Sequence, residues 1–300
     1  MEPAARVGCP RVVGRCRRDA IVMEEKSVYI IGNPRKPKVR PTLELLREWI
    51  ATRARVVGAD LGCDAAKLAA ADPDFVVVLG GDGSILGVAR ALGANQKPII
   101  GVNLGKLGYL AEFTVDEFRQ QFERLLAEPQ WISRRMMLDV RIEQPAEPVT
   151  TWAMNDCVIH AGPPFRLIEL EIHVDGTRLA TLAGDGLIIA TPGGSTAHNM
   201  SAGGPILQPG LDAIVITPIC PHSLAFRPLA VEGHSTIRIV AATVNPGTTV
   251  SVDGQLSTGL LSGDALIVKR SSECLHLARN PAYPAWHTLL TKLHWGRGLS

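Results

Sequence analysis

The chain has 300 residues, of which 46% are hydrophobic, 20% charged and 5% aromatic, and its formal charge at pH 7 is +2. This composition fits a globular protein with one large or two medium domains. The low charge and few aromatic residues argue against nucleic-acid binding, and no apolar run reaches the about 18 residues of a membrane-spanning helix. The six cysteines and eight histidines show no metal-ligand spacing, so we expect reduced thiols, a cytoplasmic protein and no protein-held transition metal.

The first half of the chain alternates between strand and helix patterns. Residues 1–22 carry five arginines and no periodicity, and we expect them to form a disordered extension. Strands and helices are then predicted in the order Ser27–Gly32, Leu43–Ile50, Ala65–Ala71, Phe75–Leu79, Ser84–Leu92, Pro98–Val102 and Val115–Leu125. This alternation predicts an α/β domain over residues 23–128, with a doubly wound, mainly parallel sheet that binds ligands beyond the carboxyl ends of its strands.

The pattern changes to a period of two near Pro129. Ile168, Leu170, Ile172 and Val174 alternate with polar residues, which predicts a half-buried antiparallel strand ending in the turn Asp175-Gly176. Further short strands are predicted at Leu187–Ala190, Ala213–Ile216, Ile237–Ala242, Thr249–Val252 and Ala265–Val268. We therefore expect a mostly-β domain over residues 129–283. Residues Trp286 to Trp295 regain helical spacing, which predicts a C-terminal helix and a segment, 284–300, that returns to the first domain.

A glycine-rich turn, Gly80-Gly81-Asp82-Gly83-Ser84, joins a predicted strand to a predicted helix. Its glycines allow positive φ and close approach of a ligand, Ser84 is placed to cap the helix, and the N–H groups favour a phosphate. The Asp82 carboxylate suits such a site only if it accepts a hydroxyl proton or helps to hold Mg²⁺, as in phosphoryl transfer to an alcohol. A purely structural turn is the alternative. A dinucleotide fingerprint fits poorly, because Leu86 stands in place of its third glycine.

A second run, from Gly184-Asp185-Gly186 to His198, has an acidic turn, an apolar strand and a loop of small residues. The Ser195 and Thr196 hydroxyls and the neighbouring N–H groups suit a diphosphate or a ribose, with a turn of no binding role as the alternative. The Gly-x-Ser-x-Gly pattern of hydrolases fails at Ala197. Cys220 and His222 are interpreted as a structural loop, and Asp253 as part of a hairpin turn rather than a ligand-binding group.

Together these stretches resemble the NAD kinase family, from about Val28 to Gly296. A glycine motif alone is shared with lipid kinases and phosphofructokinases, whereas the ordered set is specific. The matching segments are Gly80–Gly83, Gly101–Leu110, Asn155-Asp156, Asp185–Ala197, Ser201–Pro205, Thr217–His222, Asp253–Gln255 and Lys292–Gly296.

The resemblance implies an ATP-dependent enzyme that phosphorylates the adenosine ribose 2′-hydroxyl of NAD, with Asp82 as the catalytic residue. Gly80, Gly81, Gly83 and Ser84 would bind the triphosphate, Asn155 and Asp156 the adenosine and ribose, and Asp185 the nicotinamide end. Thr196 and Ala197 would line the adenine pocket, and His198 and Ser201 would be further nucleotide-binding residues. The resemblance further implies Mg²⁺ delivered with ATP, polyphosphate as a possible other donor, and a homo-oligomer, either a dimer or a tetramer.

Three departures from the family pattern affect expected affinity and selectivity: Asp156 replaces a usual Glu, Gly193 a usual Thr or Ser, and His198 a usual Tyr. Ala183 is small where some family members carry Arg, which predicts use of NADH beside NAD. Two other functions stay open from the sequence: a lipid or sugar kinase sharing the glycine motif, and a non-catalytic NAD(P)-binding sensor.

Overall fold

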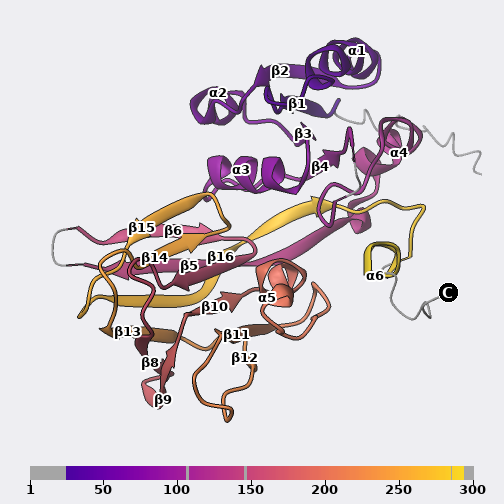
Figure 1. The fold of residues 1–300 in the computed structure, drawn as a ribbon. Helices are drawn as coiled ribbons and strands as arrows, with labels where there is room; N and C mark the ends of the chain where they lie inside the picture. The colour runs from indigo at the N-terminus through magenta and orange to yellow at the C-terminus, as the bar shows by residue number, and fades with distance from the viewer. Residues whose placement is uncertain (1–24, 106–107, 145–146, 285, 294–300) are drawn as a thin grey trace, which may run out of the picture.

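The computed structural model describes residues 25–105, 108–144, 147–284 and 286–293 (Figure 1). The predicted N-terminal extension therefore lies outside the described residues. The first half contains β1 (Ser27–Gly32), α1 (Val39–Ala51), β2 (Arg55–Leu61), α2 (Ala65–Ala71), β3 (Phe75–Leu79), α3 (Asp82–Leu92), β4 (Ile99–Val102) and α4 (Val115–Ala127).

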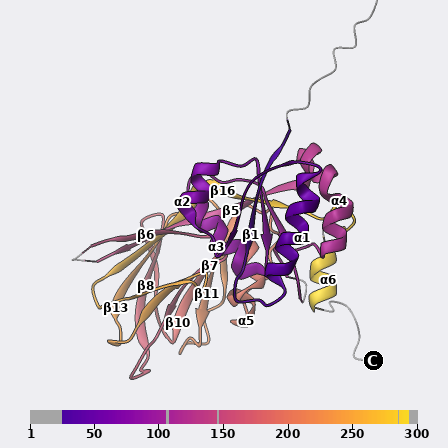
Figure 2. The ribbon, with the colours of Figure 1, turned by 90° about the horizontal axis from the view of Figure 1, so that it is seen from above.

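The four strands of this half pair in parallel in the order β2-β1-β3-β4. Helices α1 and α4 bury Leu46 and Phe118 against one face, and α2 and α3 bury Leu68 and Ile85 against the other. Figure 2 shows these two pairs on opposite sides of β1. The predicted doubly wound α/β fold is confirmed. The sequence analysis missed β2, because this strand is only half-buried and shows no alternation of buried and exposed side chains.

The second half is mostly β, as predicted. Its elements are η1 (Pro129–Trp131), β5 (Ile132–Glu143), β6 (Val149–Ala153), β7 (Asp156–His160), β8 (Ile168–Val174), β9 (Thr177–Gly184), β10 (Gly186–Ala190), η2 (Gly193–Thr196), α5 (His198–Ser201), β11 (Ala213–Ile219), β12 (Leu229–Glu232), β13 (Ile237–Thr243), β14 (Thr249–Val252), β15 (Leu256–Gly259), β16 (Ala265–Ala278) and α6 (His287–Leu293). The predicted turn at Asp175-Gly176 is confirmed, with φ of 49° and 80°.

Two sheets organise this half. One is antiparallel, in the order β12-β11-β10-β7-β14-β15. The other continues the parallel sheet of the first half, because β16 pairs in parallel with β4 at Leu277 and Ile99 and in antiparallel with β5 and β13. An apolar core that includes Leu138, Leu187 and Ile239 lies between the sheets. The boundaries proposed at residues 128 and 283 stay a prediction, since one sheet runs through both halves.

The C-terminal segment contacts the first half. The Tyr283 hydroxyl donates a hydrogen bond to Glu117 of α4, and the Lys292 ammonium lies 5.3 Å from the centre of the Tyr109 ring. In the part of the chain described here, no helix has the length and hydropathy needed to cross a membrane.

Candidate active site

The glycine-rich turn forms a tight connection between β3 and α3. Gly81 is extended (φ −109°, ψ −170°) and precedes Asp82, the first helical residue. Gly80, Gly81 and Gly83 do not adopt positive φ, so this part of the prediction is wrong. Close packing explains Gly80 instead, because a Cβ there would overlap the Ser84 side chain.

Ser84 does not cap α3, which corrects a second expectation. The helix begins two residues earlier, because Gly81 takes the extended conformation that precedes a helix. Ser84 lies in the first turn, and its hydroxyl oxygen accepts a hydrogen bond from Asn33 Nδ2 at 3.1 Å. Ser84 thereby connects the glycine-rich turn to the loop that follows β1.

The Asp82 carboxylate is held by the segment that follows β4. The N–H of Tyr109 donates to Asp82 Oδ2 at 2.8 Å, and those of Leu110 and Ala111 donate to Oδ1 at 3.0 and 3.1 Å. Gly108 allows this approach, because a Cβ there would overlap the carboxylate. Both oxygens are oriented by main-chain donors, and their remaining lone pairs can accept a further hydrogen bond from a ligand hydroxyl.

Asn155 and Asp156 lie at a main-chain corner between β6 and β7 that is built around Asp253. Asp253 Oδ1 accepts the N–H groups of Asn155 and Asp156 at 2.7 and 3.1 Å, and Oδ2 accepts that of Met154 at 3.0 Å. Asp253 (φ 51°) is in a hairpin turn between β14 and β15, as predicted. The sequence analysis missed the role of its side chain. The only signal was an acid in an Asp-Gly turn, which is also ordinary turn chemistry.

Asp156 is buried, with 4% of its surface exposed. Burial, and secondarily the charge of Asp253, raise the pKa of Asp156 to about 7. Its Oδ2 atom has no hydrogen-bond partner among the described residues. A buried carboxyl oxygen without a partner costs free energy, which suits a group that receives a donor from a ligand.

The small-residue loop, Thr191–Ala197, packs directly on this corner. The Thr191 N–H donates to the Asn155 carbonyl at 2.8 Å, and a Cβ at Gly194 would overlap the Asn155 main chain. Ser195 is fully buried, and its hydroxyl is bonded to Pro192 and Leu207, so it is occupied within the protein. Thr196 lies at the edge of this loop and is half-buried.

Two residues of the loop's short helix, His198 and Ser201, are exposed, and Ala197 before them is half-buried. The His198 ring lies 5.2 Å from that of His160, and burial together with His198 lowers the pKa of His160. The loop therefore offers a rim of small and polar groups beside Asn155 and Asp156.

Asp185 lies at the opposite end of β10 from Asp156, which pairs with Ala190. It precedes β10, whereas the small-residue loop follows that strand, and five strand residues span on the order of 16 Å. Asp185 is exposed, and its hydrogen bond with the Cys220 thiol raises the pKa of that thiol. Cys220 lies in an irregular segment, in agreement with a structural loop.

The segment that holds the Asp82 carboxylate and the small-residue loop share a cavity of about 70 Å³. It is lined by Tyr109, whose main-chain N–H binds Asp82, and by Thr196 of the small-residue loop, whereas Asp82 itself is not part of its lining. Arg135 also lines it and is paired with Glu112 at 3.7 Å. Burial lowers the pKa of Arg135, while the charges of Glu112 and Asp82 oppose this shift. Tyr109 thus connects the Asp82 carboxylate, through its main-chain N–H, to the cavity that Thr196 also lines.

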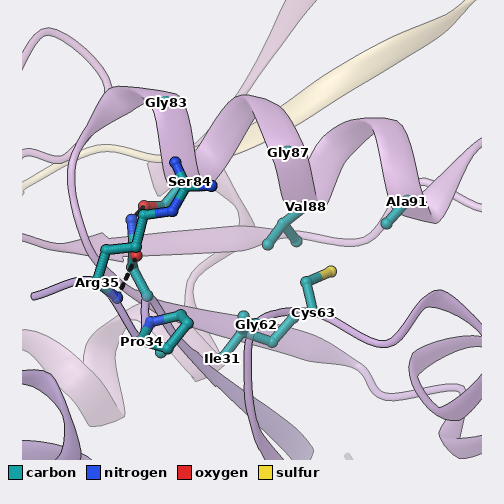
Figure 3. A pocket seen from close by; sticks show the side chains of 12 residues that line it. Ile31, Pro34, Arg35, Gly62, Cys63, Gly83, Ser84, Gly87, Val88 and Ala91 are labelled. Carbon is teal, nitrogen blue, oxygen red and sulfur yellow. Dashed lines mark hydrogen bonds between the residues drawn. The ribbon is translucent and has the colours of Figure 1, made fainter. Parts of the chain in front are cut away.

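A larger cavity of about 370 Å³ lies on the other side of the glycine-rich turn (Figure 3). One wall is α3, with Gly83, Gly87 and Ala91 on successive turns, and the other includes Arg35 after β1 and Cys63 after β2. The Lys36 ammonium also approaches the turn, 3.4 Å from where a Cβ of Gly81 would lie. Cations beside the N-terminus of α3 make this cavity suited to an anion.

Within residues 25–105, 108–144, 147–284 and 286–293, no group of three or more His, Cys, Asp or Glu side chains is arranged to hold a metal ion.

Comparisons with known proteins agree with this geometry. Residues 60–130 match the family model described as ATP-NAD kinase N-terminal domain, and residues 154–280 match that of the ATP-NAD kinase C-terminal domain. The NAD kinase of Geotalea daltonii is 45% identical over 224 residues, covering 74% of this chain and 79% of the relative. That of Geobacter sulfurreducens is 38% identical, covering 90% and 99%.

The chain is also similar to solved structures of NAD and NADH kinases. The yeast NADH kinase complexed with NADH superposes with a TM-score of 0.80 at 27% identity, over 93% of this chain and 90% of that one. An NAD kinase from Archaeoglobus fulgidus in complex with ATP superposes with a TM-score of 0.72 at 25% identity, over 89% and 98%.

Proposed function

The chain belongs to the NAD kinase family, and we propose that it transfers the γ-phosphoryl group of ATP to the 2′-hydroxyl of the adenosine ribose of NAD. The observation that carries this proposal is the Asp82 carboxylate, oriented by three main-chain N–H groups at the start of the helix that lines an anion-suited cavity.

Asp82 acts on the acceptor hydroxyl. Phosphoryl transfer proceeds through a loose transition state, which requires alignment and charge stabilisation more than covalent chemistry. Asp82 accepts a hydrogen bond from the 2′-hydroxyl, aligns that oxygen with phosphorus, and takes its proton as the new bond forms. Fixed main-chain donors keep the carboxylate in this orientation without reorganisation.

The donor occupies the larger cavity. Gly80, Gly81, Gly83 and Ser84 supply the N-terminus of α3 to the triphosphate, and Arg35 and Lys36 neutralise its charge. Mg²⁺ delivered with ATP would be held mainly by the phosphates and water and would supply charge neutralisation.

NAD occupies the other side of Asp82. Asn155 and Asp156 bind the adenosine and its ribose, and the unpartnered Asp156 Oδ2 receives a donor from them. Thr196, Ala197, His198 and Ser201 line the adenine pocket. Asp185, which lies about one strand length away, binds the nicotinamide end of the extended dinucleotide.

The protein works as a homo-oligomer, which sedimentation velocity would test.

The test is the acceptor that the purified protein uses. With Mg-ATP, we expect NADP from NAD, detected by an NADP-specific dehydrogenase, and no phosphorylation of diacylglycerol or fructose 6-phosphate. Phosphorylation of either of those acceptors in place of NAD would favour a lipid or sugar kinase. NAD binding with no turnover would favour a sensor.

A further inference from the structure

The hairpin turn Asp253-Gly254-Gln255, between β14 and β15, bonds to both halves of the candidate site. As described above, the Asp253 carboxylate holds the corner that carries Asn155 and Asp156. None of the Asp253 side chain is exposed, so these bonds are shielded from water. Figure 1 shows β14 and β15 beneath α3, the helix that begins with Asp82.

The same turn forms hydrogen bonds with α3 near both ends of the helix. Gln255 Nε2 donates to the Gly83 carbonyl at 2.7 Å, one residue after Asp82. At the last turn, Arg90 Nη2 donates to Asp253 Oδ2 at 3.0 Å, and Arg90 Nη1 donates to Gln255 Oε1 at 3.2 Å. Gly83 and Arg90, the two residues of α3 that the turn contacts, are about 10 Å apart along the helix axis. Bonds to residues in the first and last turns restrain both the position and the tilt of α3.

Gln255 lies against the side of α3 that carries Gly83 and Gly87. A Cβ on Gly83 would lie 4.0 Å from Gln255 Nε2, and a Cβ on Gly87 would lie 3.9 Å from Gln255 Oε1, both ordinary van der Waals distances. Neither Arg90 nor Gln255 has a part in the binding roles proposed above.

We propose that Asp253, Gln255 and Arg90 are positioning residues that set the distance between the Asp82 carboxylate and the Asn155–Asp156 corner. This inference rests on the proposed function. Its physical basis is that in-line transfer requires the acceptor oxygen within about 3–3.5 Å of phosphorus, and a displacement of 1 Å can reduce the rate about a hundredfold. Gln255 acts on the reaction only through α3, because it bonds to Gly83 and Arg90 rather than to a reacting group.

Gln255 offers the clearest test, since it is exposed and replacing it does not bury an unpaired polar group at position 255. Gln255→Met keeps the length of the side chain and removes both hydrogen bonds. We expect kcat to fall at least tenfold, the KM values for ATP and NAD to stay within about twofold, and Tm to change by less than about 2 °C. Ser257→Ala, an exposed change two residues further on the same hairpin, is the matched control and should leave all four values unchanged.

A kcat of Gln255→Met within twofold of the wild type would overturn the inference. So would a rise in one KM with kcat unchanged, because Gln255 would then contact that substrate directly. Asp253→Asn should lower kcat in the same direction if it folds, with a larger loss of Tm. Failure of the proposed function would appear differently, as a wild-type protein that forms no NADP.

Discussion

The proposed reaction depends on one side chain, the Asp82 carboxylate, which accepts the proton of the acceptor hydroxyl. Asp82→Asn should lower kcat about a hundredfold or more, because an amide cannot accept the proton, while the Kd for NAD stays within about twofold. A small loss of Tm is also expected, since an amide NH₂ would face one of the three N–H groups that now bind the carboxylate. The measurements are kcat, calorimetric Kd and Tm. Asp116→Asn, an exposed first-turn acid on α4, is the control. Near-normal kcat in folded Asp82→Asn would leave Asp82 a structural residue.

Asp156 should make stability depend on pH. Its pKa is about 7 in the folded protein and about 3.8 when unfolded, so the folded state holds this proton more tightly. Its contribution is therefore fully present below about pH 4 and is lost as pH rises through 7, by about 4 kcal/mol at most. Asp156→Asn removes the ionisation at constant shape. Urea unfolding at pH 5 and pH 8 should show a larger fall in the free energy of unfolding for the wild type than for the variant, and equal falls would refute this.

At this scale the sequence revealed candidate residues but not their contacts. Asp82 could be singled out because a carboxylate is out of place among glycines that suit a phosphate, and Asn155-Asp156 only through the resemblance to the NAD kinase family. The partners of Asp253 could not, because its hydrogen bonds join residues almost a hundred positions apart. Ser84 was assigned to the helix cap because a local pattern cannot show that Gly81 takes the extended conformation.

Among the elements, α3 forms one wall of the larger cavity. If that cavity holds ATP, Ala91→Leu should raise the KM for ATP about fivefold or more, because the added side chain occupies ligand volume. The KM for NAD should not change. Ala70→Leu, at an exposed position on α2, is the matched control. An unchanged KM for ATP in Ala91→Leu would place the donor elsewhere.

The elements that could be predicted were those with strong periodicity. Buried strands such as β3 and amphipathic helices such as α4 follow directly from residue pattern. The edge strand β2 was missed because one neighbour and partial burial leave a weak signal. The pairing of β16 with β4 could not be foreseen, since it joins residues near 277 to residue 99.

The protein should phosphorylate NADH as well as NAD. Ala183 lies in β9, two residues before Asp185. Its small side chain carries no positive charge that could distinguish the cationic oxidised nicotinamide ring from the neutral reduced ring. We expect measurable phosphorylation of NADH with NAD preferred, compared as kcat/KM in one preparation. A preference for NAD above about 10³-fold, or about 4 kcal/mol, would contradict this.

The most direct measurement follows the phosphoryl group from ATP to the dinucleotide. ATP labelled with ³²P at the γ position is incubated with NAD, Mg²⁺ and either the wild-type protein or Asp82→Asn, and the dinucleotide product is digested to locate the label. The account predicts label on the 2′-oxygen of the adenosine ribose with the wild type, and about a hundredth of that rate with the variant. Label found only in inorganic phosphate, at another hydroxyl, or at equal rates with both proteins would contradict it.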